Sequence, residues 1–192
     1  MPPYYYNMDS TCIYEYYRAV ANVVPDFPIY IYNIPSNVKN VVTPEVLARL
    51  IHDCPNVIGV KDSSMDLMSL INYKQAVPNG LRTFMGNDAQ IYSWLAIGGS
   101  GAVAATATVF PEVVVSIYKN WVDGNFEKAL QAQDQVIKLR AIFRGFTPIA
   151  AYKKVLEWQG IHAGIPRSPL RGLTEMEASK LHNELEKIGF NL

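Results

Sequence analysis

NVIGVKDSS, residues 56 to 64, contains a short apolar run that ends on a lysine. Val57, Ile58 and Val60 are typical of a buried strand, whereas Lys61 is a side chain that is almost never fully buried unless it is paired. A short run that is nearly all apolar favours a parallel strand that is covered on both faces. Lys61 is then expected at the carboxyl end of such a strand.

Similar runs recur along the chain, with amphipathic helical stretches between them. We expect strands at residues 27–33, 57–61, 82–86 and 101–105. We expect helices at residues 10–22, 41–53, 65–77, 88–97 and 111–122. This alternation predicts an α/β fold with a parallel sheet. Periodicity alone leaves open whether the strands are half of a doubly wound sheet or half of an eight-stranded barrel.

Capping residues support the helix boundaries. Thr43 can cap the helix that starts at Pro44, a residue that suits the first helical position. After residue 123 the alternation stops, and helices are expected at 125–143, 147–159 and 174–188. Thr174 and Glu177 can form a capping box at the start of the last helix.

The composition is that of an ordinary globular protein. Seventeen basic and seventeen acidic residues cancel, so no electrostatic signal favours nucleic acid or an anionic membrane as a partner. Cys12 and Cys54 lack metal-ligand spacing, no leader is apparent, and the apolar runs are short of the ~20 residues that a spanning helix needs. We therefore expect a reduced, cytoplasmic protein that binds a small neutral or anionic molecule.

Several kinds of catalytic site have little support. His52, His162 and His182 are isolated, so no metal is expected, and no G-x-S-x-G segment indicates a serine nucleophile. The glycine-rich GGSGAV at 98–103 precedes a strand rather than following one, which favours a tight turn over a phosphate-binding loop.

Lys61 itself has two interpretations. It can be a solvated strand end, or a partly desolvated amine at the edge where α/β folds keep their sites. Desolvation favours the neutral amine, which can attack a carbonyl. Tyr32, at the end of the preceding expected strand, could relay protons, although a tyrosine there can also be an ordinary rim aromatic.

Three consecutive aromatics, Tyr4, Tyr5 and Tyr6, follow Pro2 and Pro3 near the start of the chain. The prolines favour an extended approach. Taken alone, such a cluster is more often a packed loop than a site, because aromatic clusters are ordinary core material.

Together, these motifs resemble the family of dihydrodipicolinate synthase and N-acetylneuraminate lyase, which are pyruvate-binding Schiff-base enzymes. The resemblance runs from residue 2 to about residue 190. The segments that carry it are PPYYYN (2–7), YNIP (32–35), GVKDSS (59–64), GNDA (86–89), GGSGAVAATA (98–107) and RSP (167–169). Their order and spacing match the second half of the family's chain.

The resemblance implies a partial (β/α)₈ barrel over residues 1–123 and a C-terminal helical extension over 124–192. It implies a Schiff base between Lys61 and a 2-oxo acid, with Tyr32 as proton relay and no metal or organic cofactor. Tyr5, or Tyr6, would reach the site of a neighbouring subunit in a homotetramer. The remaining expected substrate-binding residues are Ser63, Gly86, Asp88 and Val103.

Departures from the family pattern narrow the substrate. Asn37 stands where the synthases have an arginine, and an amide cannot replace a bidentate guanidinium. Ala89 stands where sialic acid lyases have an acidic residue. A 2-keto-3-deoxy sugar acid or 4-hydroxy-2-oxoglutarate fits better as the substrate of a retro-aldolase.

The matching region starts about where the family's fourth strand ends, whereas a whole barrel takes ~250 residues. The first four strand-helix units, with the loop that grips the pyruvate carboxylate, are therefore expected to be absent from this sequence. Two hypotheses follow: a fragment of an aldolase, or an inactive half barrel that persists by pairing with a partner through open strand edges.

Overall fold

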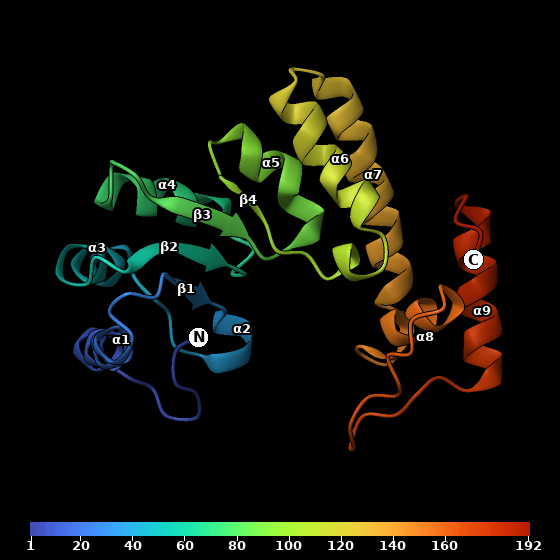
Figure 1. The fold of residues 1–192 in the computed structure, drawn as a ribbon, viewed down its shortest axis with the longest axis horizontal. Coiled ribbons are helices and arrows are strands. Elements are labelled where there is room, and N and C mark those ends of the chain that lie inside the picture. The colour runs from blue at the N-terminus through green and yellow to red at the C-terminus, as the bar shows by residue number, and fades with distance from the viewer. The chain divides into compact units, whose positions relative to one another are not determined.

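The computed structural model describes residues 1–192, and its internal contacts divide the chain into two compact units, residues 1–103 and 104–192 (Figure 1). This division lies earlier than the expected boundary after residue 123. The difference concerns helix α6 (Pro111–Val122), which belongs to the second unit.

The first unit contains a four-stranded parallel sheet in the order β1-β2-β3-β4. Its strands are β1 (Ile29–Asn33), β2 (Val57–Asp62), β3 (Arg82–Met85) and β4 (Gly101–Ala102). The predicted α/β class and parallel sheet are confirmed. β4 is shorter than expected, since only Gly101 and Ala102 pair with β3.

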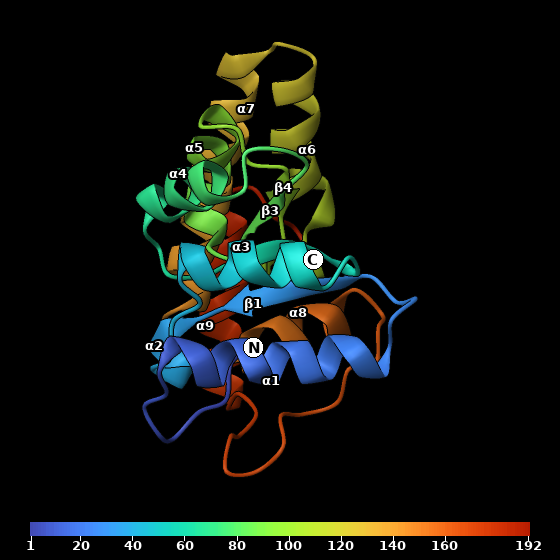
Figure 2. The same cartoon turned by 90° about the vertical axis from the view of Figure 1, so that its left-hand side faces the viewer.

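One helix precedes these strands and others connect them, as expected. They are α1 (Ser10–Val23), α2 (Pro35–Val38), α3 (Pro44–Asp53), α4 (Leu67–Ala76), the 3₁₀ turn η1 (Asp88–Gln90) and α5 (Ile91–Ala96). The short α2 was not predicted. Figures 1 and 2 show α1 and α3 along the same side of β1.

The start of α3 shows how sequence sets a helix boundary. The Thr43 hydroxyl accepts a hydrogen bond from the Val46 N–H, and Pro44 occupies the first helical position. Hydrogen bonds from its own backbone N–H and from the Thr43 hydroxyl lower the pKa of Glu45, whose charge also suits the helix dipole. The predicted cap is confirmed.

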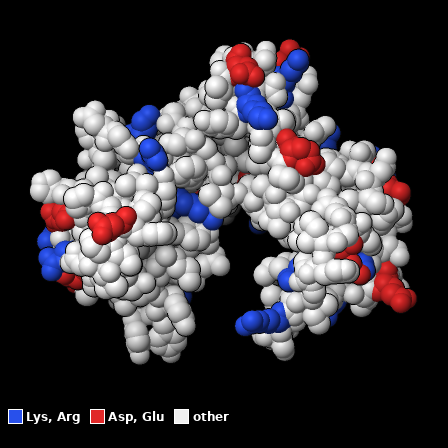
Figure 3. All heavy atoms as spheres, viewed as in Figure 1, with Lys and Arg blue, Asp and Glu red and all other residues white.

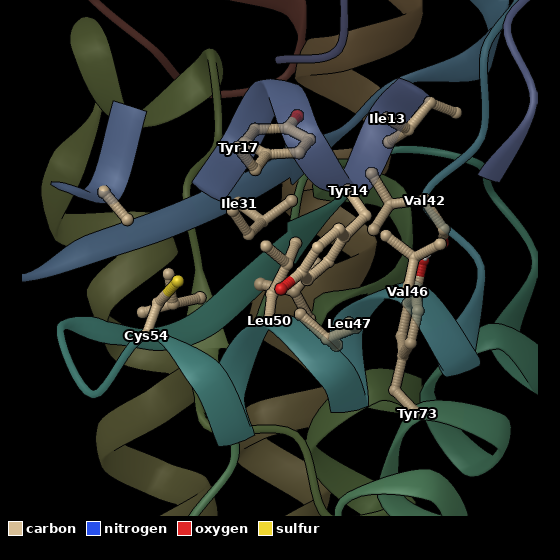
Figure 4. Packing of buried hydrophobic residues seen from close by; sticks show 13 residues of the cluster. Ile13, Tyr14, Tyr17, Ile31, Val42, Val46, Leu47, Leu50, Cys54 and Tyr73 are labelled. Carbon is tan, nitrogen blue, oxygen red and sulfur yellow. Dashed lines mark hydrogen bonds between the residues drawn. The ribbon is translucent and has the colours of Figure 1, made fainter. Parts of the chain in front are cut away.

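One face of the sheet packs against helices to form the main core. Ile31 of β1 and Val60 of β2 are fully buried there, together with Leu47 and Leu50 of α3. Figure 4 shows Tyr14 of α1 in the same cluster, packed with these side chains. Because this face of the sheet is covered by helices, only the opposite face of each strand is left for a binding site.

The GGSGAV segment forms a turn into β4, as predicted. Gly98 has a φ of +91°, a conformation that glycine adopts at little cost. The Ser100 N–H donates to the Thr83 carbonyl at 2.8 Å, and the Ser100 hydroxyl accepts from the Thr83 N–H at 3.0 Å. These bonds fasten the turn to β3.

The second unit is helical. It contains η2 (Thr106–Thr108), α6, α7 (Phe126–Phe143), α8 (Ala150–Trp158) and α9 (Glu175–Lys187). The predicted capping box of α9 is confirmed: the Thr174 hydroxyl accepts from the Glu177 N–H, and the Glu177 carboxylate accepts from the Thr174 N–H.

Charged side chains of both signs are interspersed on the face drawn in Figure 3, and much of that face is uncharged. None of the helices is long and apolar enough to span a membrane.

Candidate active site

Parallel register brings Lys61 beside Tyr32. The Cα of Tyr32 in β1 pairs with that of Lys61 in β2, and Lys61 pairs in turn with Phe84 in β3. Side chains at paired positions of a sheet point to the same face. The two predicted catalytic residues therefore share one row at the carboxyl ends of neighbouring strands.

The amine and the phenol are in contact within this row. Lys61 Nζ lies 4.0 Å from the centroid of the Tyr32 ring, a cation–π distance. The Ser63 hydroxyl donates a hydrogen bond to the Tyr32 hydroxyl at 3.3 Å. Lys61, Tyr32 and Ser63 are all half-buried, so each is partly desolvated and still reachable by a small molecule.

Gly86 makes room for this group. A Cβ at Gly86 would lie 1.7 Å from the Ser63 hydroxyl oxygen and 3.0 Å from the Asp62 carbonyl oxygen. The Gly86 N–H donates to that same carbonyl at 2.7 Å. Glycine at this position therefore lets the end of β3 approach β2 and leaves Ser63 beside Tyr32.

Two aromatic residues that were not predicted lie on the same face. Tyr30 and Phe84 meet edge to face, with ring centroids 5.3 Å apart. A Cβ at Gly59 would lie 2.7 Å from the Tyr30 ring and 2.2 Å from the Arg82 carbonyl oxygen. The glycine in VIGVK, at the centre of β2, was the available signal that another group approaches this strand closely.

The tyrosine-rich segment forms an exposed loop. Tyr5 is 74% exposed with a φ of +84°, which is unusual for a residue other than glycine. The buried Asn40 holds the loop by its backbone: its amide donates to the carbonyls of Pro3 and Tyr6 and accepts from the Met8 N–H, all within 2.9 Å. This anchor was missed from the sequence.

Asp88 and Val103 also follow strand ends. Asp88 begins η1 just after β3 and is buried. Val103 follows β4, donates its N–H to the Met85 carbonyl at 2.9 Å and is 53% exposed. The structure thus joins Lys61 and Ser63 through Tyr32 and places Asp88 and Val103 after the ends of β3 and β4.

Comparison with known proteins gives a consistent picture. Residues 1–188 match the model of the dihydrodipicolinate synthetase family. The chain belongs to this family. An uncharacterized DapA-like lyase of Halobacterium salinarum is 38% identical over 187 residues, which cover 97% of this chain and 60% of that protein. The predicted resemblance is confirmed.

Two further relatives show the breadth of the match. The 4-hydroxy-tetrahydrodipicolinate synthase of Methanopyrus kandleri is 31% identical over 97% of this chain and 62% of its own length. A variant of the 2-keto-3-deoxygluconate aldolase of Sulfolobus solfataricus, in complex with L-2-keto-3-deoxy-galactonate, has a TM-score of 0.86 at 25% identity and covers 97% of this chain and 62% of that one. The chain spans about three fifths of the length of these relatives.

Proposed function

We propose that this chain carries the Schiff-base part of a class I, pyruvate-type aldolase or lyase. The observation that carries the proposal is the contact between the Lys61 amine and the Tyr32 ring at the carboxyl ends of paired parallel strands. Membership of a family that includes synthases and aldolases supports the same chemistry.

In this mechanism, the neutral Lys61 amine attacks the ketone carbon of a 2-oxo acid to form a carbinolamine. Loss of water gives an iminium ion at C2. When a base takes the proton of the C4 hydroxyl, the C3–C4 bond breaks, the aldehyde leaves, and the electron pair passes to the iminium to give an enamine, which is protonated at C3 and hydrolysed to release the shorter 2-oxo acid. Tyr32 passes protons to and from the oxygen that leaves the carbinolamine as water. The hydrogen bond from Ser63 orients the Tyr32 hydroxyl. These steps need no metal or organic cofactor.

We propose a 2-keto-3-deoxy sugar acid or 4-hydroxy-2-oxoglutarate as the substrate. Asn37 lies exposed in α2 and has no guanidinium to bind a second carboxylate. The relative of known structure that binds L-2-keto-3-deoxy-galactonate supports a sugar-acid substrate. Activity like that of dihydrodipicolinate synthase or of sialic acid lyase is the alternative.

The sheet also supports a proposal about the fold of the intact enzyme. We propose that β1 to β4 are four consecutive strands of an eight-stranded barrel, with residues 124–192 as its helical extension. β1 and β4 are the edges of the sheet, and open edges attract further strands. We also propose that the intact protein is a homotetramer in which Tyr5 reaches a neighbouring subunit.

Reductive trapping tests the proposed chemistry. The chain is incubated with pyruvate and cyanoborohydride, and adduct formation is followed by the mass of the intact protein. We expect Lys61→Arg to remove the fast phase of labelling, because a guanidinium does not form the imine. Tyr32→Phe should slow it by about 100-fold, the typical contribution of a proton relay. If Lys61→Arg and the unaltered chain were labelled at the same rate, the proposal would be refuted.

A further inference from the structure

The strand ends carry a second polar pair on the opposite face from Lys61 and Tyr32. Asn33 follows Tyr32 in β1, Asp62 follows Lys61 in β2, and the two Cα atoms are paired in the register. Asn33 is 1% exposed and Asp62 is fully buried. The candidate site is therefore backed by two buried polar side chains, one from each strand.

A direct hydrogen bond joins the two strands through this pair. The Asn33 amide nitrogen donates to Asp62 Oδ2 at 2.7 Å, while the Asn33 amide oxygen accepts from the Val42 N–H at 3.1 Å. Each end of the Asn33 side chain therefore has a fixed identity: its oxygen faces a donor, and its nitrogen faces an acceptor.

Asp62 is surrounded by donors that carry no charge. Its Oδ1 accepts from the Ser64 N–H at 2.8 Å and from the Ser64 hydroxyl. The Tyr73 hydroxyl of α4 donates to the Val42 carbonyl at 2.7 Å and lies 3.5 Å from Asp62 Oδ2. Burial, reinforced by the Asp62 charge, raises the pKa of Tyr73, so its hydroxyl keeps its proton.

The pair lies one residue beyond the site on each strand, and this spacing has a consequence. A slip of one residue between strands would move every side chain of one strand to the other face. It would bury Tyr32 or Lys61 among the helices and break the hydrogen bond between Asn33 and Asp62. An unpaired buried carboxylate or amide is costly, so this pair penalises the slip strongly.

We propose that Asn33 and Asp62 are positioning residues, whose buried hydrogen bond holds β1 and β2 in the register that sets the Tyr32 ring against the Lys61 amine. Their significance for catalysis rests on the proposed function. The effect on geometry does not depend on it.

The direction of the bond provides a matched set of variants. In Asp62→Asn alone, the new amide nitrogen faces a donor in either orientation, the Asn33 amide or the Ser64 N–H, and Asn33→Asp alone sets two carboxylates against each other. The double swap, Asn33→Asp with Asp62→Asn, restores every partner. In the double swap, the carboxylate at position 33 accepts from the Val42 N–H and from the amide nitrogen at position 62. The amide oxygen at position 62 accepts from Ser64. Val46→Ala, a truncation in the core of α3, is the control for destabilisation.

The test measures the Lys61–Tyr32 contact by NMR. In protein labelled with ¹³C-lysine, the ε-methylene signal of Lys61, assigned with Lys61→Arg, should be shifted upfield because the amine end lies over the Tyr32 ring. We expect each single variant to lose this shift, the double swap to recover it, and Val46→Ala to keep it. Far-UV circular dichroism confirms that each sample is folded.

Reductive trapping with pyruvate adds a functional measurement. Per folded molecule, each single variant should label Lys61 at least about tenfold more slowly, since misplacement of about 1 Å can cost more than that. The double swap should label within about threefold of the unaltered chain. If the unaltered chain forms no adduct at Lys61, the proposed function fails, and the NMR result still decides the positioning. Single variants that keep the upfield shift, or a swap that fails to recover it, would overturn the proposal.

Discussion

Asp62 and Glu177 are two carboxylates that organise the backbone around them, but in different ways. Asp62 is fully buried, and its partners are neutral groups: Asn33 of β1, Ser64 just after β2, and Tyr73 of α4. Glu177 lies in the more exposed first turn of α9 and receives a bidentate pair of hydrogen bonds from Arg171, at 2.7 and 2.8 Å.

Burial decides how far the influence of each carboxylate extends along the chain. A buried carboxylate without a cation must be satisfied by fixed neutral donors, so it constrains several chain segments at once. An exposed carboxylate can exchange its partners for water, so its effect remains local. We therefore expect Asp62 to control the site and Glu177 to control only the end of a helix.

Replacement of Asp62 by leucine should have the largest effect. It leaves the Asn33 amide and the Ser64 N–H without acceptors in a buried place, which costs about 3 kcal/mol or more in the free energy of unfolding. Hydrogen exchange by mass spectrometry should show β1 and β2 opening about 100-fold more often, with α9 unchanged. If the protection of both strands were unchanged, Asp62 would not constrain β1 and β2 as we expect.

Thr174→Ala should have an intermediate effect, confined to α9. The variant loses the hydroxyl that accepts from the Glu177 N–H, and loss of such a cap costs about 1 kcal/mol. Hydrogen exchange in the first turn of α9 should quicken. Thr174→Ser, which keeps the hydroxyl, is the matched control. If exchange quickened equally in both variants, loss of the cap would not be the cause.

Glu177 should give the smallest effect, visible as a dependence on pH. The Arg171 hydrogen bonds, followed by that of the Thr174 N–H, lower the pKa of Glu177 to about 2 from 4.5. Because the folded pKa is the lower one, the stabilisation is present above pH 4.5 and is lost as the pH falls toward 2. Exchange in α9 should quicken over this window, and Glu177→Gln should abolish that dependence. If exchange in α9 of the Glu177→Gln variant kept the same dependence on pH, Glu177 would not be its source.

Much of the fold was predictable because local patterns and packing agree. Short apolar runs predicted the parallel strands, and Thr43 and Thr174 marked true helix starts. Extents were harder to predict: β4 ends after Ala102, and α2 has too few residues to show a period. The contact boundary near residue 103 depends on tertiary packing, which composition does not report.

The site was predictable only where a residue type implied chemistry. The proximity of Lys61 and Tyr32 could be predicted because an amine ends one apolar strand and a phenol ends the strand before it. Asn33 and Asp62 were missed because polar residues at strand ends usually meet solvent. The Tyr73 hydroxyl beside Asp62 comes from a different element, α4, and no local pattern indicates that contact. Whether Tyr5 serves a neighbouring subunit stays a prediction.

An unbiased map of where pyruvate reacts tests the proposed Schiff-base chemistry most directly. After reductive trapping of the unaltered chain, peptide mass spectrometry compares the labelling rate of Lys61 with those of exposed lysines such as Lys39. We expect the adduct to concentrate on the half-buried Lys61. Labelling that follows exposure, with Lys61 no faster than Lys39, would contradict it.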